Sequence, residues 1–158
     1  MDNFDRVRRI SATLDGMTFE DLPEDWQHRP VTDPALFDDV VDLVVSVRDR
    51  GRGALYILLC DEAGRLLQPC AVTDLGPVYE PDPQLIVPFA KALVHQCPDG
   101  GLAVVVARRG DPAPRETDVR WARAADAVCA GRDVRFLAAA VATPAGVFRL
   151  SALDPQAD

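Results

Sequence analysis

The feature that most limits the fold of this chain is an unbroken apolar run, LAVVVA, at residues 102–107. A strand with one face in water alternates apolar and polar residues, whereas a strand covered on both faces is apolar throughout. Gly100 and Gly101 precede the run, and a polar loop, residues 108–115, follows it. The run therefore predicts a fully buried, central β-strand.

The residues on either side of this run have the periodicities of strands and helices. From residue 54 onward the expected elements are strand 54–60, strand 65–72, helix 85–97, strand 102–107, helix 116–130, strand 134–142 and strand 147–150. Pro88 is tolerated only in the first turn of a helix, so the helix that contains it is expected to begin near residue 87. The order β-β-α-β-α-β-β predicts an α/β or α+β fold, in which a mixed sheet is flanked by helices.

The first third of the chain is more acidic than the rest. Residues 1–49 contain 12 acidic and 5 basic residues, whereas residues 50–158 contain 13 acidic and 12 basic ones. The apolar spacing predicts a short helix over residues 3–14 and a longer one over residues 33–48, with Trp26 packed as an anchor between them. These patterns divide the chain into three expected parts: an acidic helical N-terminal extension packed on the core (1–53), the core itself (54–151) and a flexible tail (152–158).

Charge and hydropathy argue against two classes of partner. The formal net charge is −8, and sequence-independent binding of nucleic acids depends on neutralising their phosphates. No apolar run reaches the roughly 18 residues that cross a bilayer. The acidic start of the chain, Met1 to Asp5, lacks the apolar segment of a signal peptide. We therefore expect a cytoplasmic protein that binds neither nucleic acids nor membranes.

The cysteines and histidines do not have the spacing of a metal site. The four cysteines are Cys60, Cys70, Cys97 and Cys129. No CxxC pair exists, and each cysteine lies in or beside an apolar stretch, which is typical of small buried side chains. His95 and Cys97 are two residues apart, and such positions do not share a helix face. His28 and His95 are far apart in the sequence, so only the fold could bring them together.

The stretch most informative about function, residues 102–119, combines a strand, a loop and the start of a helix. The chain has no GxSxG, P-loop or GxGxxG motif. In α/β sheets, ligands bind beyond the carboxyl ends of the strands, and the loop at this position contains Gly110-Asp111-Pro112. On their own these residues are typical of a turn, and Asp118 in the first turn of the next helix stabilises the helix dipole.

The same stretch resembles the signature of the JAMM/MPN metalloprotease superfamily in its RadC-like branch, HxHPSGDPxPSxxD. Gly110-Asp111-Pro112 and Pro114 match this signature, and Asp118 stands at the position of the family's aspartate metal ligand. The hairpin, the helix after it and the closing strands also follow the family's order of elements. The resemblance covers about residues 54–151 and implies the JAMM/MPN fold.

The chain departs from the family at its metal-binding and catalytic positions. Val105 and Ala107 stand where the family has its two histidine ligands, and Arg115 stands where it has a serine that supports the bound water. No glutamate is present around residues 70–72 to act as the general base. A hydrolytic zinc requires three protein ligands, an open position and a base. The resemblance therefore implies a catalytically inactive member without a metal or another cofactor.

Such a member is expected to act as a protein-interaction or scaffold module, because inactive relatives in this superfamily pair with active ones. The expected partner is another protein or a second copy of the chain, in a heterodimer or a homodimer. Two alternatives remain. In one, a hydrolase or a small-ligand-binding protein uses the cleft after residue 107. In the other, the acidic arm, with Asp38, Asp39 and Asp42, contacts a basic partner.

The candidate cleft combines arginines with acidic residues. Its members are Arg108, Arg109, Asp111, Arg115, Glu116 and Asp118. The arginines either form an anion pocket or pair locally with the acidic residues, and a pair at the surface contributes only about 0–1 kcal/mol to stability. In an enzyme, the acidic residues and His95 would be the candidates for acid–base chemistry.

Overall fold

The computed structural model describes residues 7–9, 29–31, 33, 36–76 and 80–150. Within these ranges the chain forms a six-stranded sheet in the order β1-β3-β2-β4-β5-β6. The elements are β1 (Val7–Arg9), α2 (Phe37–Val44), α3 (Val47–Arg52), β2 (Ala54–Cys60), β3 (Leu66–Val72), the 3-10 helix η3 (Pro83–Leu85), α4 (Val87–Gln96), β4 (Gly101–Ala107), α5 (Glu116–Ala130), β5 (Arg135–Thr143) and β6 (Gly146–Leu150). Strands β4 and β5 are parallel and all other neighbouring pairs are antiparallel, so the sheet is mixed.

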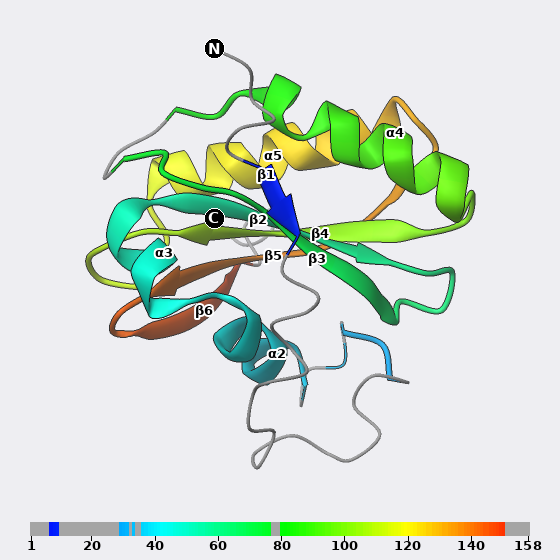
Figure 1. Cartoon of the computed structure of the whole chain (residues 1–158). Coiled ribbons are helices and arrows are strands. Elements are labelled where there is room, and N and C mark those ends of the chain that lie inside the picture. Colours follow the sequence, from blue (N-terminus) through cyan, green and yellow to red (C-terminus); the bar gives the residue numbers. More distant parts are fainter. Residues whose placement is uncertain (1–6, 10–28, 32, 34–35, 77–79, 151–158) are drawn as a thin grey trace.

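Helices cover both faces of the sheet, with α4 and α5 on one face and α2 and α3 on the other (Figure 1). In β4, Leu102, Val104 and Val106 belong to the core cluster under α4 and α5. The alternate residues of β4, Ala103, Val105 and Ala107, belong to the cluster on the α2 side. All seven residues of β4 are buried, which confirms the prediction of a central strand covered on both faces.

The order of elements from β2 to β6 agrees with the predicted β-β-α-β-α-β-β pattern. Parallel strands require a crossover connection, and α5 supplies it between β4 and β5. The helix with Pro88 begins at Val87, which confirms the expected start near that residue. The turn between β2 and β3 is closed by Asp61, whose Oδ1 accepts hydrogen bonds from the backbone N–H groups of Ala63 and Arg65, each at 2.9 Å.

Two predictions for the first third of the chain are wrong. Residues 7–9, predicted as part of a helix, form strand β1, because they pair antiparallel with β3. The helix predicted over residues 33–48 is two helices, α2 and α3, because Ser46 has an extended backbone (φ −69°, ψ 154°). Ser46 Oγ accepts a hydrogen bond from Asp49 N at 3.1 Å and so caps α3. The remainder of the predicted helix 3–14 and Trp26 lie outside the described residues, as does the tail.

Helix α2 packs on the outer part of the sheet. Its buried residues are Phe37, Val40, Val41 and Val44. Arg149 of β6 lies over the Phe37 ring, with its guanidinium carbon 5.0 Å from the ring centre, a distance typical of a cation–π contact.

None of the described helices is long and apolar enough to span a lipid bilayer.

Candidate functional site

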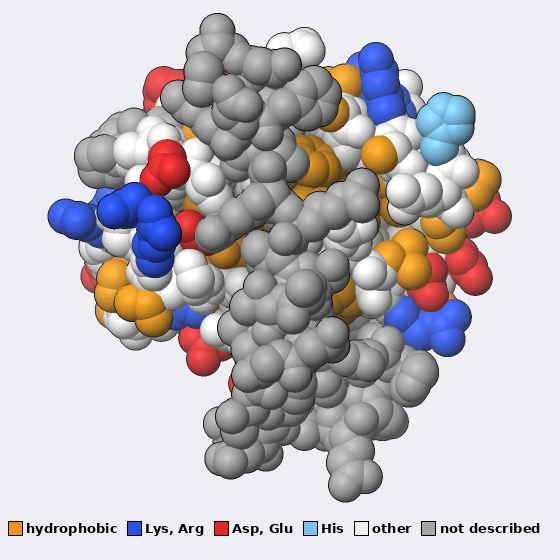
Figure 2. Space-filling model, viewed as in Figure 1, with side chains coloured by type: hydrophobic (Ala, Val, Ile, Leu, Met, Phe, Trp, Pro, Cys, Tyr) orange, Lys and Arg blue, Asp and Glu red, His pale blue; other side chains and the backbone are white. Residues whose placement is uncertain are grey.

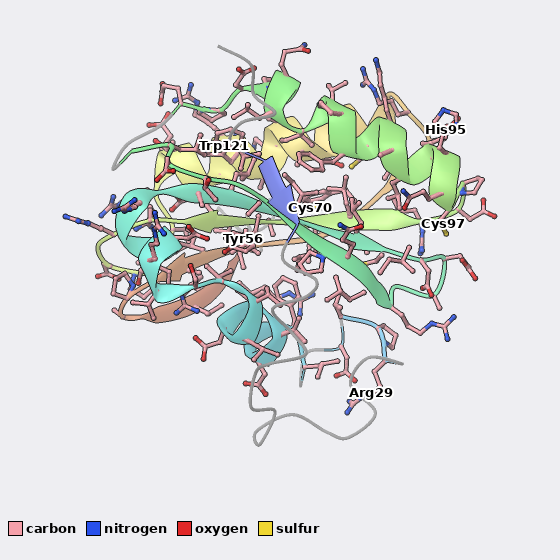
Figure 3. The ribbon with its side chains drawn as sticks, viewed as in Figure 1. Arg29, Tyr56, Cys70, His95, Cys97 and Trp121 are labelled. Carbon is pink, nitrogen blue, oxygen red and sulfur yellow. The ribbon has the colours of Figure 1, made fainter. Side chains whose placement is uncertain are left out.

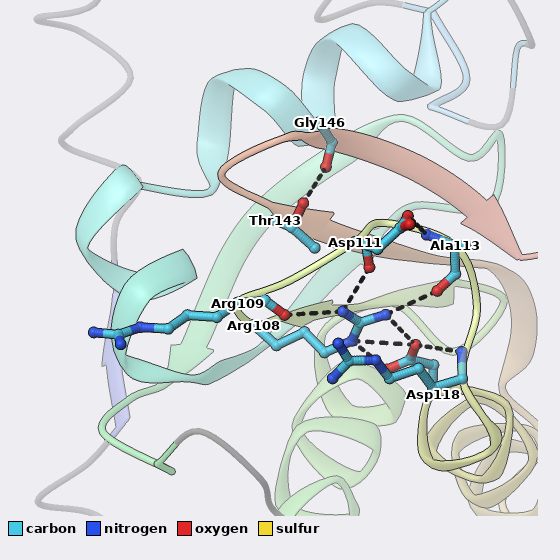
Figure 4. A network of polar contacts seen from close by, with 8 residues as sticks. Arg108, Arg109, Asp111, Ala113, Asp118, Thr143 and Gly146 are labelled. Atoms are coloured by element: carbon cyan, nitrogen blue, oxygen red, sulfur yellow. Dashed lines mark hydrogen bonds and ion pairs between the residues drawn. The ribbon is translucent and has the colours of Figure 1, made fainter.

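Arg108, the first residue after β4, carries a guanidinium group that is buried and completely hydrogen-bonded (Figure 4). Its Nε donates to Asp118 Oδ1 at 3.0 Å and its Nη2 donates to Asp118 Oδ2 at 2.7 Å, which makes a forked ion pair. The remaining N–H groups donate to the carbonyl oxygens of Arg109 at 3.0 Å, Asp111 at 2.8 Å and Ala113 at 3.0 Å. Every N–H donor of this guanidinium is therefore used, and the loop after β4 is wrapped around it.

The carboxylate of Asp118 is equally occupied. Its side chain is 1% exposed, and Oδ2 also accepts a hydrogen bond from Arg115 N at 2.8 Å. At the start of a helix, the first backbone N–H groups have no hydrogen-bond partner within the helix, and this bond satisfies one of them. Asp118 thus holds Arg108 and the first turn of α5 together. The Arg108 guanidinium therefore engages both oxygens of the carboxylate.

The other residues of the predicted cleft lie at the surface. Asp111 is exposed, and its Oδ1 accepts a hydrogen bond from Ala113 N at 2.9 Å within the loop. Arg115 is exposed and lies against Gly110, where a Cβ atom would collide with Arg115 Nη2. Glu116 is also exposed. Of the six candidate residues, the structure brings Arg108 and Asp118 together in a buried pair.

Arg109 points away from this pair (Figure 4). Its Nε donates to the carbonyl oxygen of Gly51, in α3, at 2.7 Å. Arg109 therefore belongs with α3, on the side of the sheet opposite α5. The sequence analysis places Arg109 with Arg108 and Arg115 in one cleft after residue 107, and the structure separates Arg109 from the other two.

Val105 and Ala107 are completely buried on the face of the sheet that α2 covers. Side chains alternate along a strand, so Arg108 points to the opposite face, where it meets Asp118. Val105 pairs in register with Tyr56 of β2, which lies in the same core cluster. The positions where the resemblance places the histidines and the aspartate of a metal site therefore do not converge on one point in this chain.

A second buried polar cluster, which the sequence analysis did not anticipate, lies under α3. The hydroxyl of Tyr56 (labelled in Figure 3) donates a hydrogen bond to the carboxylate of Asp49. Both residues are buried. Burial and the hydrogen bond to Asp49 raise the pKa of Tyr56 to about 12. Arg50 is also buried, and it donates to Asp42 Oδ1 at 3.0 Å and to Thr143 O at 3.2 Å. These bonds tie α2 and α3 to the sheet.

The acidic residues of α2 lie at the surface and form a solvent-exposed face of the helix. Asp38 and Asp39 are exposed in its first turn, where negative charge stabilises the helix dipole. Asp42 is 68% exposed and forms the ion pair with Arg50. One of the three carboxylates of the predicted acidic patch is therefore already paired within the chain.

His95 lies far from the loop after β4. It is exposed near the end of α4 (Figure 3). This end of α4 leads into the amino end of β4, whereas Arg108 follows the carboxyl end of β4. Cys97, beyond α4, is half-buried, and its Sγ donates to Glu62 Oε2 at 3.2 Å. The remaining three cysteines are buried, as predicted. His28 lies outside the described residues.

A shallow hollow of about 400 Å³ lies next to Arg109. It is lined by Gly51, Arg52, Asp74, Gly76 and Arg109. The sequence analysis missed the first four of these residues. The sequence does contain a signal for the hollow. Segment 51–53 precedes the first strand of the predicted hairpin and segment 74–76 follows the second, and both contain glycine. Antiparallel pairing of the two strands brings these segments side by side.

In the part of the chain that the structure describes, no three His, Cys, Asp or Glu side chains are grouped so that they could hold a metal ion. The groups that donate to the Asp118 carboxylate are the Arg108 guanidinium and the backbone N–H of Arg115, neither of which can ligate a cation. Compared with models of protein families, with curated proteins and with solved structures, the chain gives no match.

Proposed function

We propose that this chain is a non-catalytic domain of the JAMM/MPN type, similar to the RadC-like branch, which works by binding another protein chain. The observation that carries this proposal is the closed ion pair between Arg108 and Asp118. Asp118 is the one position of the family's metal site that the chain retains, and both of its oxygens accept hydrogen bonds from Arg108. An aspartate held in this way stabilises the loop and α5, and is not free to bind a metal or activate water.

The opposite face of β4 supports the same proposal. Val105 and Ala107 fill a packed core with Tyr56 and the residues of α2. Imidazole rings at these two positions would have to enter that core, where polar groups without partners are strongly unfavourable. The fold therefore uses this part of β4 for packing.

The sheet edge at β6 offers a place for a partner chain. β6 is the last strand in the sheet order, so its outer N–H and C=O groups pair with no described strand, and an edge of this kind is a template for pairing. Phe148, at the middle of β6, is 43% exposed. We infer that a second copy of the chain pairs antiparallel with β6 about a twofold axis, which places the two Phe148 side chains against each other.

The net charge predicts how salt affects this pairing. Each copy carries a formal charge of −8, so two copies repel each other over distances that dissolved ions screen. The pairing of backbone groups and of Phe148 depends much less on salt. We therefore expect self-association to be weak at low ionic strength and stronger at high ionic strength.

Sedimentation equilibrium of the purified chain tests the proposal. The wild type is expected to form dimers in a manner that depends on protein concentration, and F148Q is expected to remain monomeric under the same conditions. L67Q is the matched control, because Leu67 is 49% exposed but lies on β3; its association should equal that of the wild type. A monomeric wild type at high concentration and high salt, or an F148Q variant that dimerises equally well, would rule out pairing at β6.

A further inference from the structure

The hollow beside α3 lies where α3 ends, β2 begins, and β3 and β4 end. Blue side chains gather beside α3 at the left of Figure 2, and the hollow is lined by two arginines, Arg52 and Arg109. Among the residues that the structure describes, Asp74 is the one acidic side chain that lines it. In a chain with a formal charge of −8, a depression with more cationic than anionic lining is a local exception, and it could attract an anion.

The wall of the hollow is built from backbone that is held in place. Leu75 N donates to Gly53 O at 2.9 Å, and Gly76 N donates to Arg52 O at 3.0 Å. Gly53 has a φ of +86°, and a Cβ atom there would collide with the carbonyl oxygen of Gly76. The segment after β3 is therefore fixed closely against the end of α3. At Gly76 the absence of a side chain leaves open space.

The two guanidinium groups have donors to spare. Arg109 is oriented by the bond from its Nε to Gly51 O at 2.7 Å, and its two terminal nitrogens form no hydrogen bond with a described residue. Arg52 Nη1 lies 3.7 Å from Asp74 Oδ1, which is too long for a hydrogen bond. Both side chains of that loose pair are more than half exposed. Unlike the guanidinium of Arg108, neither of these two groups has all of its N–H donors used by described residues.

We propose that this hollow binds an oxyanion, either a phosphate or a carboxylate group, between Arg52 and Arg109. The planar fork of a guanidinium matches both groups with two parallel hydrogen bonds. Enclosed pockets for whole small molecules bury most of the ligand against apolar walls. This hollow is shallow and its lining is formed by arginine, aspartate and glycine, so it suits a charged group rather than an apolar ring. The proposal does not depend on the non-catalytic role proposed above.

Asp74 gives the proposal a sharp test. Its carboxylate is the anion nearest to Arg52, so an incoming oxyanion must compete with it and is repelled by it. Asp74 has a φ of 58°, a left-handed conformation that asparagine adopts as readily as aspartate. D74N therefore removes the competing charge without straining the backbone, and it should bind the oxyanion more tightly than the wild type.

The experiment is a titration of the full chain with inorganic phosphate, and separately with acetate, at constant ionic strength maintained with sodium chloride. The Nε–H signals of the arginine side chains are followed by NMR. The signals of Arg52 and Arg109 should shift in a saturable manner. R109Q should weaken binding by about tenfold, R109K should weaken it less because the charge remains, and D74N should strengthen it by about threefold. R123Q, at an exposed position on α5, should leave the affinity unchanged.

The two probes distinguish the sources of the shared chemistry. Tighter binding of phosphate assigns the site to phosphate-bearing ligands, and tighter binding of acetate assigns it to carboxylates. Equal affinity of the wild type, R109Q and D74N for both probes would overturn the proposal. Equal shifts at Arg52, Arg109 and Arg123 would also overturn it, because they would indicate a general effect of charge. Thermal unfolding of each variant verifies that it is folded.

Discussion

Arg108 and Asp118 are ten residues apart in the chain, and their side chains meet in a buried pair in which Nη2 lies 2.7 Å from Oδ2. Their exposed fractions are 5% and 1%, so water screens this pair far less than it screens the pairs at the surface. The pair closes the loop after β4 onto the first turn of α5. Its strength is therefore the first quantity to measure.

Breaking this pair should destabilise the chain strongly. D118A is expected to lower the free energy of unfolding by about 3–5 kcal/mol, because the buried Arg108 loses its counter-charge. R108A should cause a comparable loss. Because each single change already breaks the pair, the double variant should lose less than the sum of the two, by roughly 0.5–3 kcal/mol. Urea unfolding of the four proteins gives these values.

The pair between Arg120 and Glu80 is the control, since its side chains are 48% and 68% exposed. R120A should change the free energy of unfolding by less than about 1 kcal/mol. Strictly additive losses in the Arg108 and Asp118 variants, or a loss in D118A as small as that in R120A, would show that the buried pair does not hold the loop.

Two glycines only two positions apart should respond in opposite ways to alanine. At Gly53 the φ of +86° and the nearby carbonyl oxygen of Gly76 leave no room for a Cβ atom, so G53A should destabilise by more than about 1–2 kcal/mol. At Gly51, in α3, a Cβ atom meets nothing within 4 Å, so G51A should stabilise by up to about 1 kcal/mol. Thermal unfolding measures both, and a similar change in the two variants would contradict the close contact at Gly53.

Stability should decline in alkaline solution. Burial raises the pKa of the Cys60 and Cys129 thiols from 9.0 to about 12, and that of the Tyr56 hydroxyl from 10.0 to about 12. The folded chain thus keeps these protons at pH values where the unfolded chain releases them. The stability that these raised pKa values contribute is complete below about pH 9 and is lost as the pH rises toward 12. The free energy of unfolding should fall by up to about 1.4 kcal/mol per pH unit for each group.

The measurement is the urea midpoint as a function of pH, for the wild type and for Y56F. The substitution removes Tyr56 from the groups whose pKa the fold raises, so the decline between pH 10 and 12 should become shallower in Y56F. Parallel declines in the two proteins would show that Tyr56 ionises equally easily in the folded and unfolded chains.

The sequence predicts the second half of the fold well because its signals are local. The apolar run of β4 and the periodicity of α5 each lie within one element, so neither depends on a distant partner. The sequence predicts a helix at residues 7–9, but their extended conformation is set by pairing with β3, which lies far away in the sequence. The break at Ser46 also depends on a distant residue, since α3 is held partly by the hydrogen bond from Arg50 to Thr143, 93 residues later in the chain.

The candidate site was harder to predict than the fold. In the sequence, Arg108 is the first residue of a polar loop and looks exposed. Its burial follows from three carbonyl oxygens and one carboxylate that only the folded loop brings together. The hollow was not predicted at all, because Arg52, Asp74 and Arg109 come from three segments that meet only when β3 and β4 pair with β2.

Zinc binding by the purified full chain tests the central claim most directly. The claim is that Asp118 is committed to Arg108 and that the chain is not a metal-dependent hydrolase. Calorimetric titration with zinc, followed by metal analysis after dialysis, should show no stoichiometric binding to the wild type and no difference between the wild type and D118N. Retention of about one zinc per chain, lost in D118N, would contradict the claim.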